Sequence, residues 1–267
     1  MKNIGFIGCG NMGGAIIGGI INSGITQPEN IVVYDKSAIS IEGVRGKYNI
    51  TVAKDEKDAA KRSDVLFLAV KPSVIYDVID DIKACISNNT VVVSIAAGQS
   101  IEKIENAFGK KVSLMRVMPN TPALVGEGMS ALSPNSVLDK DEAAKEYIMR
   151  IFSGIGKAEL VPEKLMDAVT GVSGSSPAYV FMFIEALADA AVLAGMPRNQ
   201  SYTFAAQAVL GSAKMVLETG LHPGELKDMV CSPGGTTIEA VSVLEEKGMR
   251  SSVLEAVKAC VEKSKKL

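Results

Sequence analysis

The first fourteen residues, MKNIGFIGCGNMGG, constrain the fold more than any other stretch of the chain. A short apolar run, Ile4 to Ile7, leads into the glycine-rich stretch Gly8 to Gly13, and apolar residues resume at Ala15. This order predicts a strand, a tight glycine turn and a helix. In that arrangement the pattern G-x-G-x-x-G binds the pyrophosphate of a dinucleotide.

Each of the three glycines has a physical reason to be there. Gly8 permits the tight turn, Gly10 lets the backbone approach the phosphates, and Gly13 lets helix and strand pack closely. Free N–H groups at the start of the helix then face the anion. An ordinary tight turn is the alternative. The next apolar run, Ile31 to Tyr34, ends in Asp35 and favours the dinucleotide site.

Up to about residue 160, short apolar runs alternate with helical stretches. This alternation predicts an α/β fold with a Rossmann-type, doubly wound, mostly parallel sheet. The expected strands are 3–7, 31–35, 65–70, 91–95, 112–117, 129–133 and 156–161. The expected helices are 11–23, 40–48, 73–86, 100–108 and 139–152.

After Pro162 the strand patterns stop. Ser176-Pro177 predicts a helix start, and Gly195 predicts its end. Further helices are expected at about 199–219, 223–230, 236–247 and 251–265. We therefore expect a dinucleotide-binding domain over 1–161 and an all-α domain over 162–267 that dimerises and binds substrate. The 177–194 helix is apolar on nearly every side, which predicts a subunit interface.

Composition argues against several classes of function. A net charge of −2 gives no dominant basic field for nucleic acid or a membrane surface. The apolar helix carries Glu185 and Asp189, which favours a buried soluble helix over a membrane span. Scattered cysteines without C-x-x-C spacing predict a reducing, cytoplasmic setting. The one histidine, His222, precedes Pro223 at a helix start, so we expect a surface or capping role and no metal site.

Ligands of an open parallel sheet lie beyond the carboxyl ends of its strands. Asp35 is placed to bind an adenosine ribose 2′-OH, which favours NAD, whereas Lys36 and Ser37 could contact the 2′-phosphate of NADP. Both coenzymes therefore stay open. Two more segments end at this edge, Ala69-Val70-Lys71-Pro72 and Ala96-Ala97-Gly98.

Each of these two segments has two interpretations. Lys71 either positions the coenzyme or simply leads into a helix that starts at Pro72. The small side chains of Ala96 and Ala97 either let a nicotinamide ring approach the backbone or form a plain turn.

A second dense motif, CSPGGTTIE, covers Cys231 to Glu239. Thr236 and Glu239 have the spacing of a capping box, so we expect a helix to begin at Thr236. Two glycines before a helix N-terminus predict an anion site. A substrate carboxylate fits this site better than a second dinucleotide, because no strand precedes these glycines. A normally capped turn between two helices is the alternative. Hydroxyl groups here favour substrate orientation over strong base catalysis.

Six stretches, taken together, resemble the pyrroline-5-carboxylate reductase family. They are GFIGCGNMG, DVLFLAVKP, SIAAG, RVMPNTPALVGEGMSAL, DAVTGVSGSSPAYVFMFIEALADAA and LKDMVCSPGGTTIEAVSVLE. The resemblance implies reduction of 1-pyrroline-5-carboxylate to L-proline by NADPH or NADH, the last step of proline synthesis. It also implies a homodimer through the C-terminal helices and higher assemblies such as decamers.

The resemblance also implies roles for particular residues. Coenzyme contacts would come from Gly8, Cys9, Gly10, Asn11, Met12, Val70, Lys71 and Ala97, with the ribose near position 35. A further coenzyme contact of the family falls near Glu56. An acid there would repel the 2′-phosphate of NADP, which weakens the case for that coenzyme. Substrate contacts would come from Glu163, Ser232, Gly235, Thr236 and Thr237. Thr237 would hydrogen-bond the nitrogen that becomes the proline amine.

The chemistry suits these residues, because a protonated imine is already electrophilic and needs mainly a well-placed hydride donor. A β-hydroxyacid dehydrogenase is the nearest alternative. That family needs a catalytic lysine in the stretch that corresponds to Gly171 to Pro177, which has none. A redox-sensing protein that binds NAD(P) without turnover is a second alternative, and the complete second motif argues against it.

Overall fold

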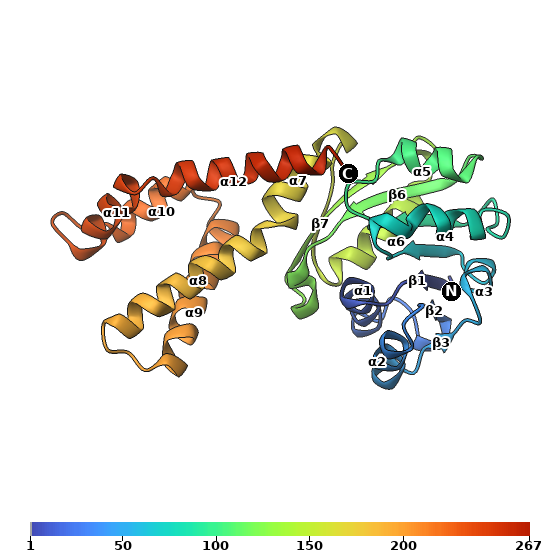
Figure 1. The fold of residues 1–267 in the computed structure, drawn as a ribbon, viewed down its shortest axis with the longest axis horizontal. Coiled ribbons are helices and arrows are strands. Elements are labelled where there is room, and N and C mark those ends of the chain that lie inside the picture. The colour runs from blue at the N-terminus through green and yellow to red at the C-terminus, as the bar shows by residue number, and fades with distance from the viewer. Residues whose placement is uncertain (1) are drawn as a thin grey trace. The chain divides into compact units, whose positions relative to one another are not determined.

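The chain folds into a sheet flanked by helices and a separate set of long helices. The computed structural model describes residues 2–267, and these divide into two compact units. We call them the sheet unit (residues 2–175 with Cys260–Leu267) and the helical unit (Ser176–Ala259). Figure 1 shows the strands of the sheet unit and the helices that flank them.

The sheet has eight strands in the order β3-β2-β1-β4-β5-β6-β7-β8. Neighbouring strands are parallel except β6 and β7, which are antiparallel. The mostly parallel sheet predicted from the sequence is confirmed. The strands are β1 (Ile4–Ile7), β2 (Ile31–Tyr34), β3 (Thr51–Val52), β4 (Val65–Leu68), β5 (Val91–Ser94), β6 (Ser113–Met118), β7 (Gly128–Pro134) and β8 (Gly156–Leu160).

Helices connect the strands and cover the sheet on both faces. The α-helices of the sheet unit are α1 (Asn11–Asn22), α2 (Ala38–Tyr48), α3 (Glu56–Lys61), α4 (Ile75–Ile82), α5 (Ile101–Phe108), α6 (Glu142–Ser153) and α7 (Met166–Val169). The short turns are η1 (Pro28–Asn30), η2 (Pro72–Val74), η3 (Thr121–Val125), η4 (Leu138–Lys140), η5 (Glu163–Leu165) and η6 (Thr170–Gly174). The sequence did not predict α3 or the two-residue strand β3.

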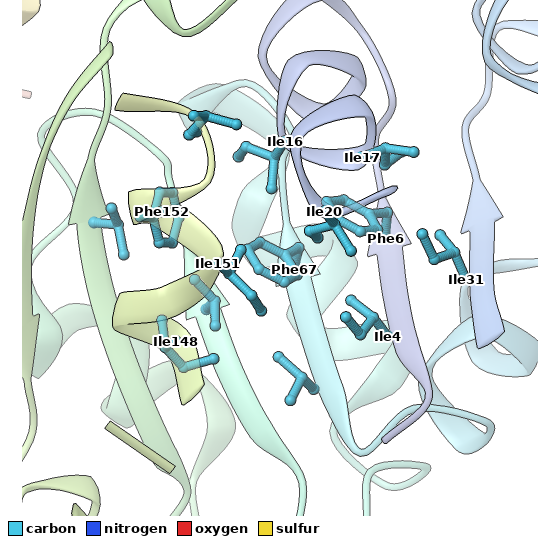
Figure 2. Packing of buried hydrophobic residues seen from close by; sticks show 14 of the residues in the cluster. Ile4, Phe6, Ile16, Ile17, Ile20, Ile31, Phe67, Ile148, Ile151 and Phe152 are labelled. Atoms are coloured by element: carbon cyan, nitrogen blue, oxygen red, sulfur yellow. The ribbon is translucent and has the colours of Figure 1, made fainter. Parts of the chain in front are cut away.

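Alternate residues of each central strand enter different cores, because successive side chains point to opposite faces. In β4, Val65 and Phe67 join the core beneath α1 and α6, whereas Leu66 and Leu68 join the core beneath α4 and α5. The Phe6 and Phe67 rings stack with centroids 4.5 Å apart (Figure 2). Burial on both faces explains why these strands are apolar without alternation.

A π-turn joins α7 to the long helix α8 (Ser176–Leu193). The sequence predicted a helix start at Ser176-Pro177, and this start is confirmed, because α8 begins at Ser176. The turns before it join it to α7, so a helical stretch runs from Glu163 to Leu193. Ser175 N–H donates to the Thr170 carbonyl at 2.8 Å, five residues back, within the π-turn η6. Pro177 has no N–H to offer the carbonyl of Ser173. That carbonyl instead accepts from the Asn120 amide at 3.0 Å.

The helical unit buries little of its own surface. Its helices are α8, α9 (Arg198–Thr219), α10 (Pro223–Val230), α11 (Thr236–Glu246) and α12 (Met249–Ser264), whose end belongs to the sheet unit. α8 and α9 lie side by side (Figure 1). Its buried residues are Ala188, Ser201, Ala205 and Leu226. Large apolar side chains such as Phe181 and Phe204 are more than 60% exposed.

Among the described residues, one helical stretch, Glu163–Leu193, has the length and apolar composition of a membrane span. Only 6% of its most apolar window is buried within the chain.

The structure also confirms the capping role predicted for His222. His222 is the N-cap of α10, and its Nδ1 accepts from Gly224 N–H at 3.0 Å.

Candidate active site

The strand order reverses at β1, with β2 on one side and β4 on the other. The glycine turn follows β1 at this point, where a parallel sheet opens a crevice beyond its strand ends. Gly8 has a φ of +98°, and a Cβ there would lie 2.4 Å from the Ala69 carbonyl oxygen at the end of β4. A Cβ on Gly13 would lie 2.5 Å from the Gly8 carbonyl oxygen. Both positions therefore require glycine for the turn itself.

Gly10 differs from the other two glycines. It is the N-cap of α1, and a Cβ there would have no protein atom within 4 Å. Cys9, Gly10 and Asn11 contribute to the lining of a groove of about 610 Å³, which also includes Gly18 and Asn22 of α1. The open N-terminus of α1 at this groove can therefore receive an anion.

Asp35 ties the end of β2 to the glycine turn. Its Oδ2 accepts from the Cys9 N–H and its Oδ1 from the Ser37 N–H, both at 2.8 Å. Burial, together with the nearby Asp35 carboxylate, raises the pKa of the Cys9 thiol to about 12. Cys9 therefore stays a protonated, packed thiol, and its contribution to ligand binding is its backbone.

Lys36 and Glu56 lie beside Asp35 and face each other. Lys36 Nζ is 3.9 Å from Glu56 Oε1, and the Lys36 side chain is 75% exposed, against 14% for Glu56. The Ser37 hydroxyl accepts from Ser40 N–H at 3.2 Å and so caps α2.

The ends of β4 and β5 complete this edge. Lys71 is the exposed N-cap of η2 and Pro72 is its first residue, so the predicted helix start at Pro72 is confirmed. Ala96 is buried, Ala97 is partly exposed, and Gly98 has a φ of +73°. The structure thus collects the sequence-predicted coenzyme residues along one edge of the sheet unit. They are Gly8, Cys9, Gly10, Asn11, Met12, Gly13, Asp35, Lys36, Ser37, Glu56, Ala69, Val70, Lys71, Pro72, Ala96 and Ala97.

The second predicted anion site lies in the helical unit. Gly235 is the N-cap of α11 and Thr236 is the first residue of the helix, so its predicted start is confirmed. The predicted capping box is wrong, because glycine occupies the cap and no side chain bonds the helix end. A Cβ on Gly235 would lie 2.4 Å from the Ser232 hydroxyl oxygen and 3.1 Å from the Ser232 carbonyl oxygen, so a larger residue requires that hydroxyl to rotate away. The absence of a capping side chain leaves donors of this helix end open to an anion.

The hydroxyl groups at this loop differ in exposure. Ser232 and Thr236 are exposed, whereas Thr237, the second residue of α11, is partly buried. The cysteines are free thiols, and residues 2–267 contain no group of three His, Cys, Asp or Glu side chains that could hold a metal ion.

Sequence reasoning missed two buried polar residues that brace the sheet unit. The Arg116 guanidinium contacts Glu163 Oε1 at 2.9 Å, and the same oxygen accepts from Ile101 N–H at 2.6 Å. Asn120 accepts from Met129 N–H at 2.8 Å while its amide holds Ser173. Both lie in the stretch RVMPNTP, and their burial is a property of the fold that local sequence patterns do not reveal.

Replacing Arg116 by methionine should lower the free energy of unfolding by about 2 kcal/mol. A fully buried pair that loses one partner costs about 3–5 kcal/mol, and the Glu163 side chain is 33% exposed, which reduces the loss. Urea unfolding measures the change. The double variant R116M/E163Q serves as the control and should lose less than the sum of the single variants. A single-variant loss below about 0.5 kcal/mol, as for an ordinary surface substitution, would contradict the bracing role.

Comparisons with known proteins agree with this geometry. Residues 3–98 match the family model described as NADP oxidoreductase coenzyme F420-dependent, and residues 163–267 match the one described as pyrroline-5-carboxylate reductase dimerisation. The chain is 54% identical to a pyrroline-5-carboxylate reductase of Escherichia coli, covering 100% of this chain and 98% of that one. It is 47% identical to one of Methanosarcina acetivorans, with the same coverage.

A solved pyrroline carboxylate reductase of Plasmodium falciparum with NADP bound is 35% identical. It superposes with a TM-score of 0.90 and covers 99% of this chain and 97% of its own. The glycine turn, the strand edge and these similarities define a dinucleotide-dependent oxidoreductase. The match to the dimerisation model and the relatives that align over the full length identify the family within this class. The chain belongs to the pyrroline-5-carboxylate reductase family.

Proposed function

We propose that this chain transfers a hydride from NADPH or NADH to the imine carbon of 1-pyrroline-5-carboxylate. The hydride adds to the carbon of the C=N bond and one proton goes to the nitrogen, giving L-proline and the oxidised coenzyme. This is the final step of proline biosynthesis. The observation that carries the proposal is the pairing of an open glycine turn with a second helix end that lacks a side-chain cap.

The coenzyme residues of the sheet unit have separate tasks. The N–H groups at Gly10 and Asn11 would hold the pyrophosphate at the start of α1. Asp35 would meet the adenosine ribose, while Val70 and Lys71 would line the path toward the nicotinamide. Ala97 would let the ring approach the backbone. When bound, the coenzyme supplies the hydride.

The loop before α11 would bind the substrate. Its uncapped helix end would receive the substrate carboxylate, with Ser232, Gly235 and Thr236 around it. Thr237 would hydrogen-bond the ring nitrogen and orient the imine, with water or the substrate supplying the proton. Orientation is the main requirement, because the protonated imine is already electrophilic.

Glu163 would also line the substrate site. Its Oε1 is taken by Arg116 and Ile101, so Oε2 is the oxygen that could face a ligand. We propose a division of work in which residues 1–161 bind the dinucleotide and residues 162–267 bind substrate and dimerise.

The exposed apolar helices support a homodimer, which we propose assembles further, as in a decamer. A partner chain rather than a membrane would then cover Phe181 and its neighbours. The free cysteines and the net charge of −2 support a soluble protein of the cytoplasm without a nucleic-acid partner. Analytical ultracentrifugation at micromolar concentration should give a dimer or a larger species, and a monomer would contradict this assembly.

A direct assay tests the proposed reaction. Absorbance at 340 nm should fall when enzyme, pyrroline-5-carboxylate and NADH or NADPH are mixed, and proline should accumulate in equal amount. A six-membered cyclic imine carboxylate serves as a parallel substrate for ring-size preference. Coenzyme binding without turnover of either imine would favour a sensor and overturn the proposal.

A further inference from the structure

The end of β2 carries a fixed negative charge at the glycine turn. Both oxygens of Asp35 accept backbone N–H groups at 2.8 Å, one of them from Cys9 within the turn. A carboxylate offers about four acceptor positions, so room remains for the hydroxyl groups of a ribose. An acid at this position of a Rossmann-type fold hydrogen-bonds the ribose 2′-OH of NAD.

The groups that would favour a 2′-phosphate are already engaged. Lys36, which follows Asp35 in the chain, lies 3.9 Å from Glu56; the Glu56 side chain is only 14% exposed, so its charge gains more from the contact than the exposed Lys36 does. The Ser37 hydroxyl accepts from Ser40 N–H and fills one donor of the α2 N-terminus. A phosphate would therefore compete with Glu56 for Lys36, while the Ser37 hydroxyl keeps its own proton to donate.

The local field is negative as well. Burial raises the pKa of Tyr34, the last residue of β2, and the carboxylates of Glu56, Asp55 and Asp35 raise it further. A phosphate monoester carries a charge of about −1.5 to −2 at neutral pH. These carboxylates would repel it, whereas a neutral hydroxyl gains a hydrogen bond.

We propose that Asp35 and Glu56 make this chain prefer NADH to NADPH as the hydride donor. Asp35 selects the free ribose 2′-OH, and Glu56 holds Lys36 away from the role of a phosphate ligand. The inference rests on the proposed function, because it concerns the coenzyme of that same reaction.

The coenzyme preference is measured as the ratio of kcat/KM for NADH to that for NADPH. The wild type should favour NADH by about 10-fold or more, which corresponds to about 1.4 kcal/mol. Asp35→Asn and Glu56→Gln should each move the ratio toward NADPH by about 10-fold. Glu42→Gln, an exposed acid on α2 that pairs with Arg45, is the matched control and should leave the ratio unchanged.

A binding experiment without chemistry separates the two proposals. Calorimetry should find that ADP binds the wild type more tightly than 2′,5′-ADP, and that Glu56→Gln narrows the difference. Tighter binding of 2′,5′-ADP with normal imine reduction would overturn the NADH preference and leave the proposed function intact. Tighter binding of ADP without imine reduction would overturn the proposed function and leave the preference for the NAD form of the coenzyme intact. Thermal unfolding shows whether either variant misfolds. If Asp35→Asn misfolds, Glu56→Gln still tests the proposal.

Discussion

A Gly10→Ala variant will fold like the wild type and bind NADH about 100-fold more weakly. A Cβ at Gly10 meets no protein atom within 4 Å, and the φ of −63° suits alanine. Loss of glycine from the N-cap should cost about 1 kcal/mol or less. The added methyl group would occupy the space that a pyrophosphate needs at the start of α1, and 100-fold in affinity corresponds to about 2.7 kcal/mol.

Gly8→Ala is the matched control for this experiment. Its Cβ would lie 2.4 Å from the Ala69 carbonyl oxygen, at a φ of +98°. Strain of this kind and the clash should together lower the free energy of unfolding by about 2–5 kcal/mol. Urea unfolding and titration of NADH fluorescence separate the two effects. If Gly10→Ala binds NADH as the wild type does, the pyrophosphate does not lie at this helix end.

Replacing Thr237 by alanine should lower kcat/KM for pyrroline-5-carboxylate about 100-fold. Loss of one well-placed hydrogen-bond donor typically reduces the rate by about 10²–10³-fold. Thr237 is the second residue of α11 and is only partly buried, so the melting temperature should change by less than about 2 °C. The affinity for NADH, measured without substrate, should stay within a factor of two of the wild type, since binding of the coenzyme alone does not involve this hydroxyl.

Thr237→Ser tests whether the hydroxyl group carries the effect. Serine keeps the oxygen and loses only a methyl group, so kcat/KM should recover to within about fivefold of the wild type, or about 1 kcal/mol. Full activity of Thr237→Ala would rule out the role. An equal loss in both variants would assign the effect to packing rather than to the hydrogen bond.

The parts of the site that depend on local chemistry were predictable from the sequence. The glycine turn, the start of α11 at Thr236 and the cap at His222 each follow from a few neighbouring residues. The strands followed from apolar runs, because burial on both faces leaves little room for polar residues. The two-residue strand β3 was too short to give a pattern.

Features that depend on distant partners were not predictable. The π-turn lies where Pro177 leaves the Ser173 carbonyl without a helix partner, and the side-chain amide of Asn120, more than fifty residues earlier, donates to that carbonyl instead. The contact of Arg116 with Glu163 likewise joins residues 47 positions apart. The capping box failed for a local reason, since glycine at position 235 moved the cap one residue earlier than the threonine.

The scarcity of buried residues in the helical unit has a thermodynamic consequence. The unit has only four buried residues among those described, and three of them are alanine or serine: Ala188, Ser201, Ala205 and Leu226. They bury too little apolar surface to offset the conformational entropy lost when the helices of the unit become ordered. If the partner chain supplies the missing contacts, folding of this unit and subunit association form a single equilibrium. Its stability would then rise with protein concentration, and dilution alone would act as a denaturant.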